Sequence, residues 1–269
     1  MIDLPKTKYC HLDIQNDWLT IYLDNHKKKN ALSSILIDEV IKVLDISGQS
    51  ESIRGIIFKG KNGIFSSGAD LEELHQITYD KEHSEKLTIR MSMRIGHLLK
   101  AIANIPKITI SVIDGPCIAG GFGMACATDI VITMESSVFR LSETKLGLTP
   151  AQIAPYVLNR IEYSKARLLM LLGDTIDGKM AYEMGLADYL VTSDSEVDGL
   201  IDEIQSKVDK CSPNALAMTK KDLSSNQTID IERAADLFSE CINHPEGQEG
   251  LQSFFEKRKP FWTKIKNES

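Results

Sequence analysis

The sequence predicts an α/β fold whose last quarter is helical. Short apolar runs bounded by glycine, such as residues 108–114, are typical of buried strands. The longer segments between them carry an apolar residue every three or four positions, which is typical of helices. Strands separated by helices favour parallel pairing through right-handed crossovers.

The strands are predicted from alternation or from short apolar runs. Alternation of apolar and polar residues marks the first two, a run that begins at Gly55 marks the third, and near-continuous apolar runs mark the later ones. In chain order, the predicted strands are residues 9–14, 18–24, 55–59, 108–114, 130–135 and 189–192.

The helices are predicted from periodicity together with start and stop signals. An acidic first turn marks the segment after Asp70, and Pro213 suits the first turn of a late helix. In chain order, the predicted helices are residues 33–45, 71–75, 84–105, 121–127, 151–172 with a break near Ile161, 178–184, 195–211, 213–223 and 230–241.

The chain reads as one unit with a helical appendage. It has no low-complexity linker and no repeat at solenoid periods. We expect residues 1–192 to form the core that carries the site, and residues 193–269 to form a helical C-terminal region. The apolar faces of that region need the core, another subunit, or both to cover them.

Composition is that of an ordinary globular chain. The 269 residues are 42% hydrophobic, which supports a large core, and the net charge of −7 favours neither nucleic acid nor an anionic membrane as a partner. The first ten residues resemble neither a signal peptide nor a transit peptide, and no apolar stretch is long enough to span a bilayer, so we expect a cytoplasmic protein. The five cysteines are scattered as reduced thiols would be, and the six histidines show no metal-ligand spacing, so we expect no metal site.

Two glycine turns are the first candidates for function. Gly120 and Gly121 stand where a buried strand passes into a helix, so their backbone N–H groups can face a ligand with the helix dipole behind them. Gly68, Ala69 and Asp70 repeat the strand–turn–helix pattern. Two such turns could give two backbone donors to one carbonyl oxygen. The alternatives are close packing for the glycine pair and a simple helix cap for the second turn.

Glu143 is the candidate acid–base residue. It follows a strand and lies among apolar and small residues, where burial would raise its pKa toward neutrality. A surface glutamate, or a helix-cap partner of Ser142, is the alternative. Lysines at 27–29 and the basic segment 256–260 are solvated charged turns in the simplest interpretation, although both could meet phosphates.

Taken together, these segments resemble the crotonase, or enoyl-CoA hydratase/isomerase, superfamily. The match covers nearly the whole chain in family order, through residues 30–32, 65–71, 114–130, 139–147, 185–187 and 249–258. The resemblance implies a crotonase-like spiral of ββα repeats, a helical C-terminal trimerisation region, and a trimer or a hexamer built from two trimers. It also implies that coenzyme A enters as part of the substrate and that no separate cofactor is needed.

The resemblance assigns roles to particular residues. It implies that the backbone N–H groups of Ala69 and Gly120 form the oxyanion hole for an acyl-CoA thioester, and that Glu143 is the catalytic side chain. For CoA binding it implies Lys28, Lys29, Ser67 and Asp70, together with Phe254 and Lys257, which can reach the nucleotide of a neighbouring subunit.

One position departs from the two-glutamate hydratases of the superfamily. Gly123 stands where they carry the first acid, so Glu143 remains alone. The segment 139–157 is similar to the methylglutaconyl-CoA and isohexenylglutaconyl-CoA hydratase branch, which pairs glycine with glutamate at these sites. That likeness implies degradation of branched-chain or isoprenoid acyl groups.

The leading expectation is hydration of an α,β-unsaturated acyl-CoA to a 3-hydroxyacyl-CoA through a stabilised enolate. The alternatives are an isomerase or a decarboxylase that uses the same enolate, and a non-catalytic protein that binds CoA esters. We expect segments 71–77, 90–98 and 149–156 to supply the pocket wall. Gln152 or Arg140 could contact a terminal carboxylate or a water, with surface or packing roles as the alternative.

Overall fold

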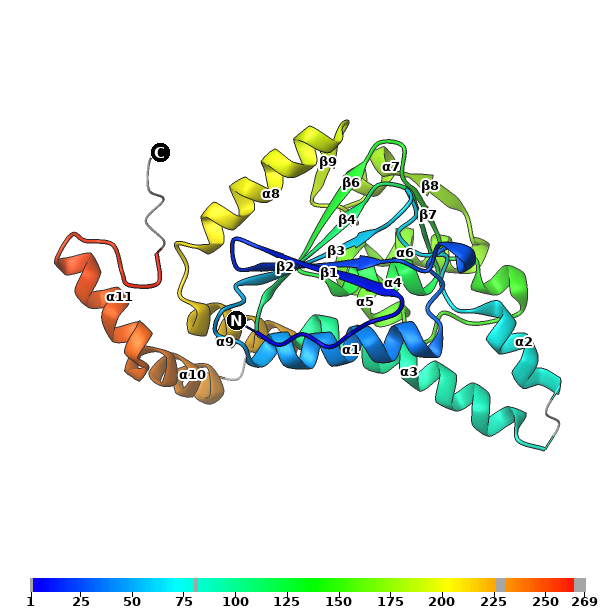
Figure 1. Cartoon of the computed structure of the whole chain (residues 1–269), viewed down its shortest axis with the longest axis horizontal. Coiled ribbons are helices and arrows are strands. Elements are labelled where there is room, and N and C mark those ends of the chain that lie inside the picture. Colours follow the sequence, from blue (N-terminus) through cyan, green and yellow to red (C-terminus); the bar gives the residue numbers. More distant parts are fainter. Residues whose placement is uncertain (1, 80–81, 226–230, 264–269) are drawn as a thin grey trace.

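The computed structural model describes residues 2–79, 82–225 and 231–263. Its main feature is a six-stranded sheet in the order β1-β2-β3-β4-β6-β9, beside a three-stranded sheet in the order β5-β7-β8 (Figure 1). Helices cover both faces of the main sheet, which confirms the predicted α/β class.

The main sheet is parallel except at one edge. β1 (Cys10–Gln15) pairs antiparallel with β2 (Trp18–Leu23). From β2 onward every neighbour is parallel, through β3 (Gly55–Gly60), β4 (Ile108–Ile113), β6 (Ile130–Met134) and β9 (Tyr189–Val191). The carboxyl ends of parallel strands meet at one edge of a sheet, so the turns that follow β3 and β4 come together there.

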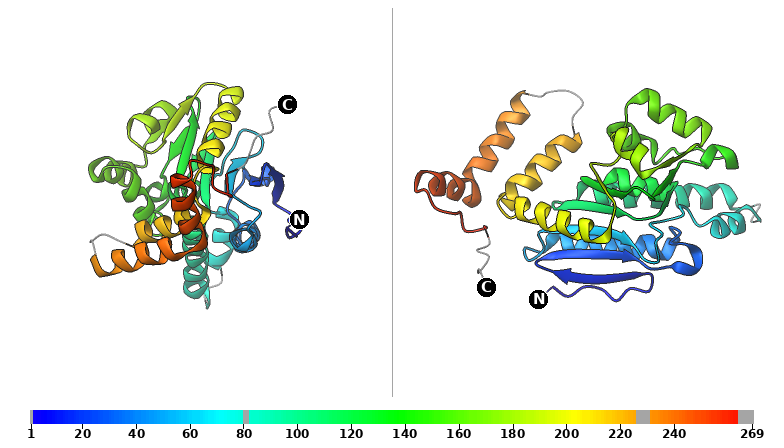
Figure 2. Two further views of the ribbon diagram at one scale, coloured as in Figure 1. Left: turned by 90° about the vertical axis from the view of Figure 1, so that its left-hand side faces the viewer. Right: turned by 90° about the horizontal axis from the view of Figure 1, so that it is seen from above.

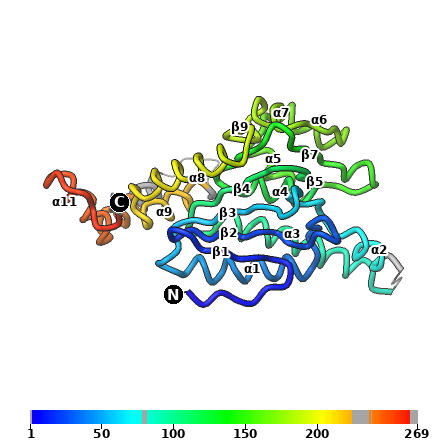
Figure 3. Tube along the Cα trace, turned by 45° about the horizontal axis from the view of Figure 1, so that its top comes forward, coloured from blue at the N-terminus to red at the C-terminus, as the bar shows by residue number. Residues whose placement is uncertain are grey.

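Alternation along the strands divides the apolar residues between two layers. Ile56 and Phe58 of β3 point into the larger core, whereas Ile57 between them points to the opposite face. The larger core packs against α1 (Ser34–Gln49), α3 (Ser84–Asn104) and α4 (Gly120–Ala127), and the smaller one against α8 (Asp194–Val208). Figure 3 shows α1 and α8 on opposite sides of the strands.

The remaining helices lie around the main sheet and its two helical layers or extend from their ends. They are α2 (Leu71–Tyr79), α5 (Ala154–Arg160), α6 (Tyr163–Leu172), α7 (Gly178–Glu183), α9 (Pro213–Ser225), α10 (Ile231–Asn243) and α11 (Pro245–Phe255), and the short 3-10 turns are His26–Lys28 and Glu143–Leu146. α10 and α11 extend from one end of the molecule, while α2 and the start of α3 extend from the other (Figures 1 and 2). None of the described helices combines the length and apolar character needed to cross a membrane.

The predicted elements are present, and the structure adds several that the sequence patterns did not reveal. The second sheet consists of β5 (Pro116–Ile118), β7 (Val138–Arg140) and β8 (Thr175–Asp177), each too short to show a period. α11 was missed because Gly247 and Gly250 weaken its helical signal, although Pro245 suits its first turn. α1 runs four residues beyond its expected end at Asp45, and the break expected near Ile161 separates α5 from α6. Residue 230, where the last predicted helix was to begin, lies outside the described residues.

Candidate functional site

A cavity of about 320 Å³ lies where the turns after β3 and β5 meet α2, α3 and the segment 142–153. We call it the Glu143 cavity. Its wall is largely apolar, and among the residues that the structure describes around it, Glu143 alone carries an ionisable side chain. The expected wall segments contribute to it, through Leu71 and Leu74, through Met91, Ser92 and Ile95, and through residues 149–153. A larger hollow of about 940 Å³ lies beside α9 and holds none of the candidate residues.

The turn after β3 is held by glycine and by hydrogen bonds to the loop at residue 30. Gly68 has a φ of +88°, and a Cβ atom there would lie 2.7 Å from the Cβ of Ala119 and 3.2 Å from the amide nitrogen of Gly120. Its carbonyl accepts from the Leu32 N–H at 2.7 Å, and the Ser66 hydroxyl donates to the Asn30 carbonyl at 2.7 Å. The two glycine turns are therefore in direct contact, which only glycine at position 68 permits.

The turn after β5 places a strained residue just before α4. Ala119 has φ +50° and ψ −115°, a conformation that L residues seldom adopt, and it is held by its N–H donating to the Arg140 carbonyl at 2.8 Å. Gly120 is the first residue of α4, so its N–H has no partner within the helix. Among the described residues, the N–H groups of Ala69 and Gly120 donate to no other group of the chain.

The second glycine of the pair has a packing role. A Cβ atom on Gly121 would lie 2.7 Å from the Ser66 Cβ and 2.9 Å from the Ser66 carbonyl oxygen. Close approach of α4 to the turn at Ser66 therefore explains Gly121, as the packing alternative proposed. That close approach brings Gly120 and Ala69 to the wall of one cavity.

Glu143 lies at the start of the turn Glu143–Leu146 and is only 9% exposed. Neither carboxylate oxygen has a hydrogen-bond partner on another described residue. Burial raises the pKa of this carboxyl, and its own backbone N–H opposes the rise only in part. The surface alternative is wrong because the side chain is buried, and the cap alternative is wrong because Ser142 makes no side-chain cap bond.

Apolar side chains fill the space next to Gly123. A Cβ atom there would lie 3.0 and 3.1 Å from two carbons of Ile153 and 3.3 Å from Leu99. A carboxylate at this position would therefore require Ile153 and Leu99 to move. The Glu143 cavity is built around one acid.

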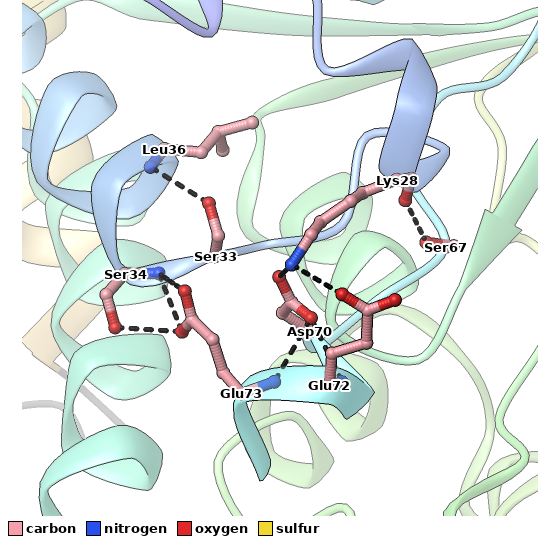
Figure 4. A network of polar contacts seen from close by, with 8 residues as sticks. All are labelled: Lys28, Ser33, Ser34, Leu36, Ser67, Asp70, Glu72 and Glu73. Atoms are coloured by element: carbon pink, nitrogen blue, oxygen red, sulfur yellow. Dashed lines mark hydrogen bonds and ion pairs between the residues drawn. The ribbon is translucent and has the colours of Figure 1, made fainter. Parts of the chain in front are cut away.

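Lys28 and Asp70 are bound to each other (Figure 4). The Lys28 ammonium lies 2.6 Å from Asp70 and 3.1 Å from Glu72, and the hydrogen bonds to these carboxylates raise the pKa of Lys28. Asp70 is nearly buried, and its other oxygen accepts from the N–H groups of Glu72 and Glu73 at 3.1 and 3.3 Å. Asp70 thus caps α2 directly after the Ala69 amide.

Glu73 extends this network to α1. Its carboxylate accepts from the Ser34 hydroxyl at 3.0 Å and from the Ser34 N–H at 3.1 and 3.3 Å (Figure 4). Ser67 joins the basic turn from the other side, since its hydroxyl donates to the Lys28 carbonyl at 3.2 Å. Sequence reasoning missed Glu73 and Ser34. The three-residue spacing from Asp70 to Glu73 was the available signal, because it is that of a capping box.

The other candidate residues fall in different places. Lys29 is exposed in the basic turn, and Gln152 lines the Glu143 cavity. The backbone carbonyl of Arg140 accepts a hydrogen bond from the Ala119 N–H. Phe254 and Lys257 are exposed in and just after α11, at the end of the molecule opposite α2, so a single chain does not bring them to the cavity (Figure 1). Within the described part of the chain, no group of His, Cys, Asp or Glu side chains is arranged to hold a metal.

Comparison with known proteins identifies the family. Residues 13–266 match the family model for enoyl-CoA hydratase/isomerase. A probable enoyl-CoA hydratase of Bacillus subtilis is 31% identical over 86% of this chain and 90% of its own length. The mitochondrial methylglutaconyl-CoA hydratase of Mus musculus is 30% identical over 93% of this chain and 81% of its own length.

Comparison with solved structures supports the same family. The crystal structure of an enoyl-CoA hydratase/isomerase from Marinobacter aquaeolei superimposes with a TM-score of 0.89 at 29% identity, covering 95% of this chain and 99% of that one. The crotonase resemblance and the fold it implied are thereby confirmed. The chain belongs to the enoyl-CoA hydratase/isomerase family of enzymes.

Proposed function

We propose that this protein adds water to an α,β-unsaturated acyl-CoA thioester and forms the 3-hydroxyacyl-CoA. The observation that carries the proposal is one buried carboxyl, Glu143, in the same cavity as the N–H groups of Ala69 and Gly120, which donate to none of the residues that the structure describes. The Glu143 carboxyl can transfer a proton. The two N–H groups can donate hydrogen bonds to an oxygen that gains negative charge during the reaction.

In this mechanism, the thioester oxygen accepts hydrogen bonds from the N–H groups of Ala69 and Gly120. Water attacks C3 as Glu143 takes its proton, and the electrons of the C2–C3 double bond move to the thioester oxygen as an enolate. Glu143 then returns the proton to C2, so the net change is the addition of one water. One preorganised donor in such a hole contributes about 3 kcal/mol, and the acid–base step about 10²–10⁴-fold in rate.

The CoA portion would lie along the basic turn. Lys29 is exposed there, Ser67 lines the cavity and donates to the Lys28 carbonyl, and the Lys28 ammonium pairs with Asp70, next to Ala69. We propose that Lys28 and Lys29 meet the CoA phosphates, with Ser67 and Asp70 placing the thioester end. Phe254 and Lys257 of one chain would reach the nucleotide bound to a neighbouring subunit.

Double-bond isomerisation is the second candidate, and one observation favours it. Glu143 is the single ionisable side chain among the described residues of the cavity, and Ile153 occupies the space where a second acid would lie. One carboxylate can move a proton between C2 and C4 without water. Decarboxylation requires only the enolate, and a protein without turnover would require only binding.

One assay separates these candidates. The protein is incubated with crotonyl-CoA, 3-methylglutaconyl-CoA, a 3-enoyl-CoA and, to detect decarboxylation, a malonyl-type CoA ester in ¹⁸O-labelled water, and the products are identified by mass spectrometry. Hydration predicts labelled 3-hydroxyacyl-CoA from the 2-enoyl esters. Migration of the double bond without label would support the isomerase instead, and binding without any product would support the non-catalytic alternative.

The variant Glu143→Gln tests the assigned acid–base role. We expect turnover to fall by about 10²–10⁴-fold while the CoA ester still binds. Glu183→Gln, at an exposed position in α7, is the matched control and should retain activity. Near-normal hydration by the Glu143→Gln protein would remove Glu143 from the mechanism.

A further inference from the structure

Gln152 stands between the Glu143 cavity and a second hollow. It lines the cavity together with Ala151 and Ile153, and it also lines an adjoining hollow of about 330 Å³. The other residues of that hollow are Met93, Gly96, His97, Lys100, Ala151, Pro155 and Tyr156. The second hollow opens toward solvent at His97 and Lys100, both of which are exposed. Gln152 and Ala151 are thus a partition between two spaces.

The Gln152 amide packs against α3 at Ser92 and Gly96. Its Nε2 donates to the Ser92 hydroxyl at 3.2 Å. A Cβ atom on Gly96 would lie 2.4 Å from Oε1 and 2.9 Å from Cδ, so the amide occupies the space that the missing side chain leaves. One hydrogen bond between neutral, partly exposed groups is weak, so the amide can leave this seat at little cost. Of the two residues of the partition, Ala151 and Gln152, it is Gln152 that carries a movable side chain.

In the proposed complex, the partition lies at the end of the cavity that would hold the acyl group of the substrate. In the proposed complex the thioester oxygen lies at Ala69 and Gly120, and the CoA portion leaves past Ser67 and the basic turn. The acyl group must then extend the other way, toward α3 and the segment 149–153. Gln152 belongs to both of those walls through its own position and its bond to Ser92.

We propose that Gln152 is a specificity-determining gate at the acyl end of the site. Seated on Ser92 and Gly96, it ends the cavity and favours short acyl groups. Turned away, it joins the cavity to the second hollow, and a longer chain can pass along Met93 and Pro155. This inference rests on the proposed acyl-CoA function and adds to it the length of acyl group that the enzyme accepts.

The test is the chain-length profile of the full-length protein. Hydration rates are measured with 2-enoyl-CoA esters of four, eight and twelve carbons for the wild type, Gln152→Ala and Ser92→Ala. We expect the wild type to prefer four carbons. Gln152→Ala should raise kcat/KM for the twelve-carbon ester relative to that for the four-carbon ester by about tenfold or more, because apolar contacts of a few methylenes are worth that much.

Ser92→Ala keeps the Gln152 side chain and removes only its acceptor, so it should shift the profile in the same direction by less. It also carries the test if Gln152→Ala does not fold. Gln205→Ala, on α8 across the sheet, is the matched control and should leave the profile unchanged. An unchanged ratio of twelve- to four-carbon rates in both variants, or a wild type without length preference, would overturn the gate while the hydratase proposal stands. Absence of hydration with every ester would instead remove the proposed function itself.

Discussion

At the scale of single residues, Glu143 is a carboxyl that the fold holds at a cost. Both oxygens are buried without a partner on another described residue, and burial raises the pKa of the group. A buried ionisable group of this kind usually costs stability, and such costs concentrate at functional sites. The burial that disfavours its charged form is what would suit it to exchange a proton near neutral pH.

The stability of Glu143→Gln should reveal this cost. Because the folded-state pKa lies above the ordinary glutamate value, the wild type loses stability relative to the variant as pH rises through that raised pKa. We expect the Tm of the variant to exceed that of the wild type at about pH 8, and the excess to shrink as the pH falls. Below about pH 4 the carboxyl is neutral in both the folded and the unfolded wild type, so the pH-dependent part of the difference should vanish. Thermal melts from pH 4 to pH 8 would contradict this if the difference stayed constant.

Asp70 should matter more to stability than its neighbour Glu72. Asp70 is nearly buried, caps α2 and pairs with Lys28, so Asp70→Ala should lower the free energy of unfolding by about 1–2 kcal/mol. Glu72 meets the same lysine, but its side chain is 77% exposed, and Glu72→Gln should change stability by less than about 0.5 kcal/mol. Urea unfolding of both variants makes the comparison, and equal losses would contradict the cap assignment.

At the scale of elements, the site depends on how closely α4 approaches its neighbours. Gly121 lets α4 meet the turn at Ser66, and Gly123 lets Ile153 and Leu99 pack against the helix. The contact at Ser66 aligns two turns, and the contact at Gly123 removes the space for a second acid. Both contacts are possible because glycine has no side chain.

Introducing an acid at position 123 should therefore destabilise the protein and fail to create a two-acid site. Gly123→Glu forces Ile153 and Leu99 aside and buries a charge, so we expect a loss of about 1–3 kcal/mol. The double variant with Ile153→Ala makes room and should recover part of that loss. Calorimetric Tm values for the two variants test this, and a Gly123→Glu protein as stable as the wild type would show that the space is not filled as described.

At the scale of the whole molecule, the C-terminal helices extend from the body with apolar side chains exposed. Phe238 is 70% exposed, and Phe254 and Phe255 are 76% and 78% exposed, on α10 and α11. Exposed apolar side chains gathered in one region are typical of interaction sites, and subunit contacts are one kind. α8, by contrast, covers the sheet through Val197 and Ile201, so the first helix after residue 193 also serves the core. The proposed division at residue 193 stays a prediction.

We expect the protein to assemble through these helices as a trimer or a dimer of trimers. Light scattering after size-exclusion chromatography should then give three or six times the chain mass of 30.0 kDa. Phe254→Asp with Phe255→Asp should lower the measured mass, because burying two charges at a subunit contact is costly. A wild-type mass equal to that of one chain would contradict the proposal.

The sequence by itself determined the class of fold, the strand–turn–helix units and the two glycine turns, because periodicity and glycine are local signals. It also singled out Glu143, and its resemblance to the crotonase superfamily pointed to the missing acid at Gly123. Only the tertiary structure decided that Glu143 is buried, that Lys28 pairs with Asp70, and that Ile153 fills the space beside Gly123. Each of these contacts involves residues that are far apart in the chain. The energy of such a contact depends on the distance between the residues, and that distance is set only when the chain folds.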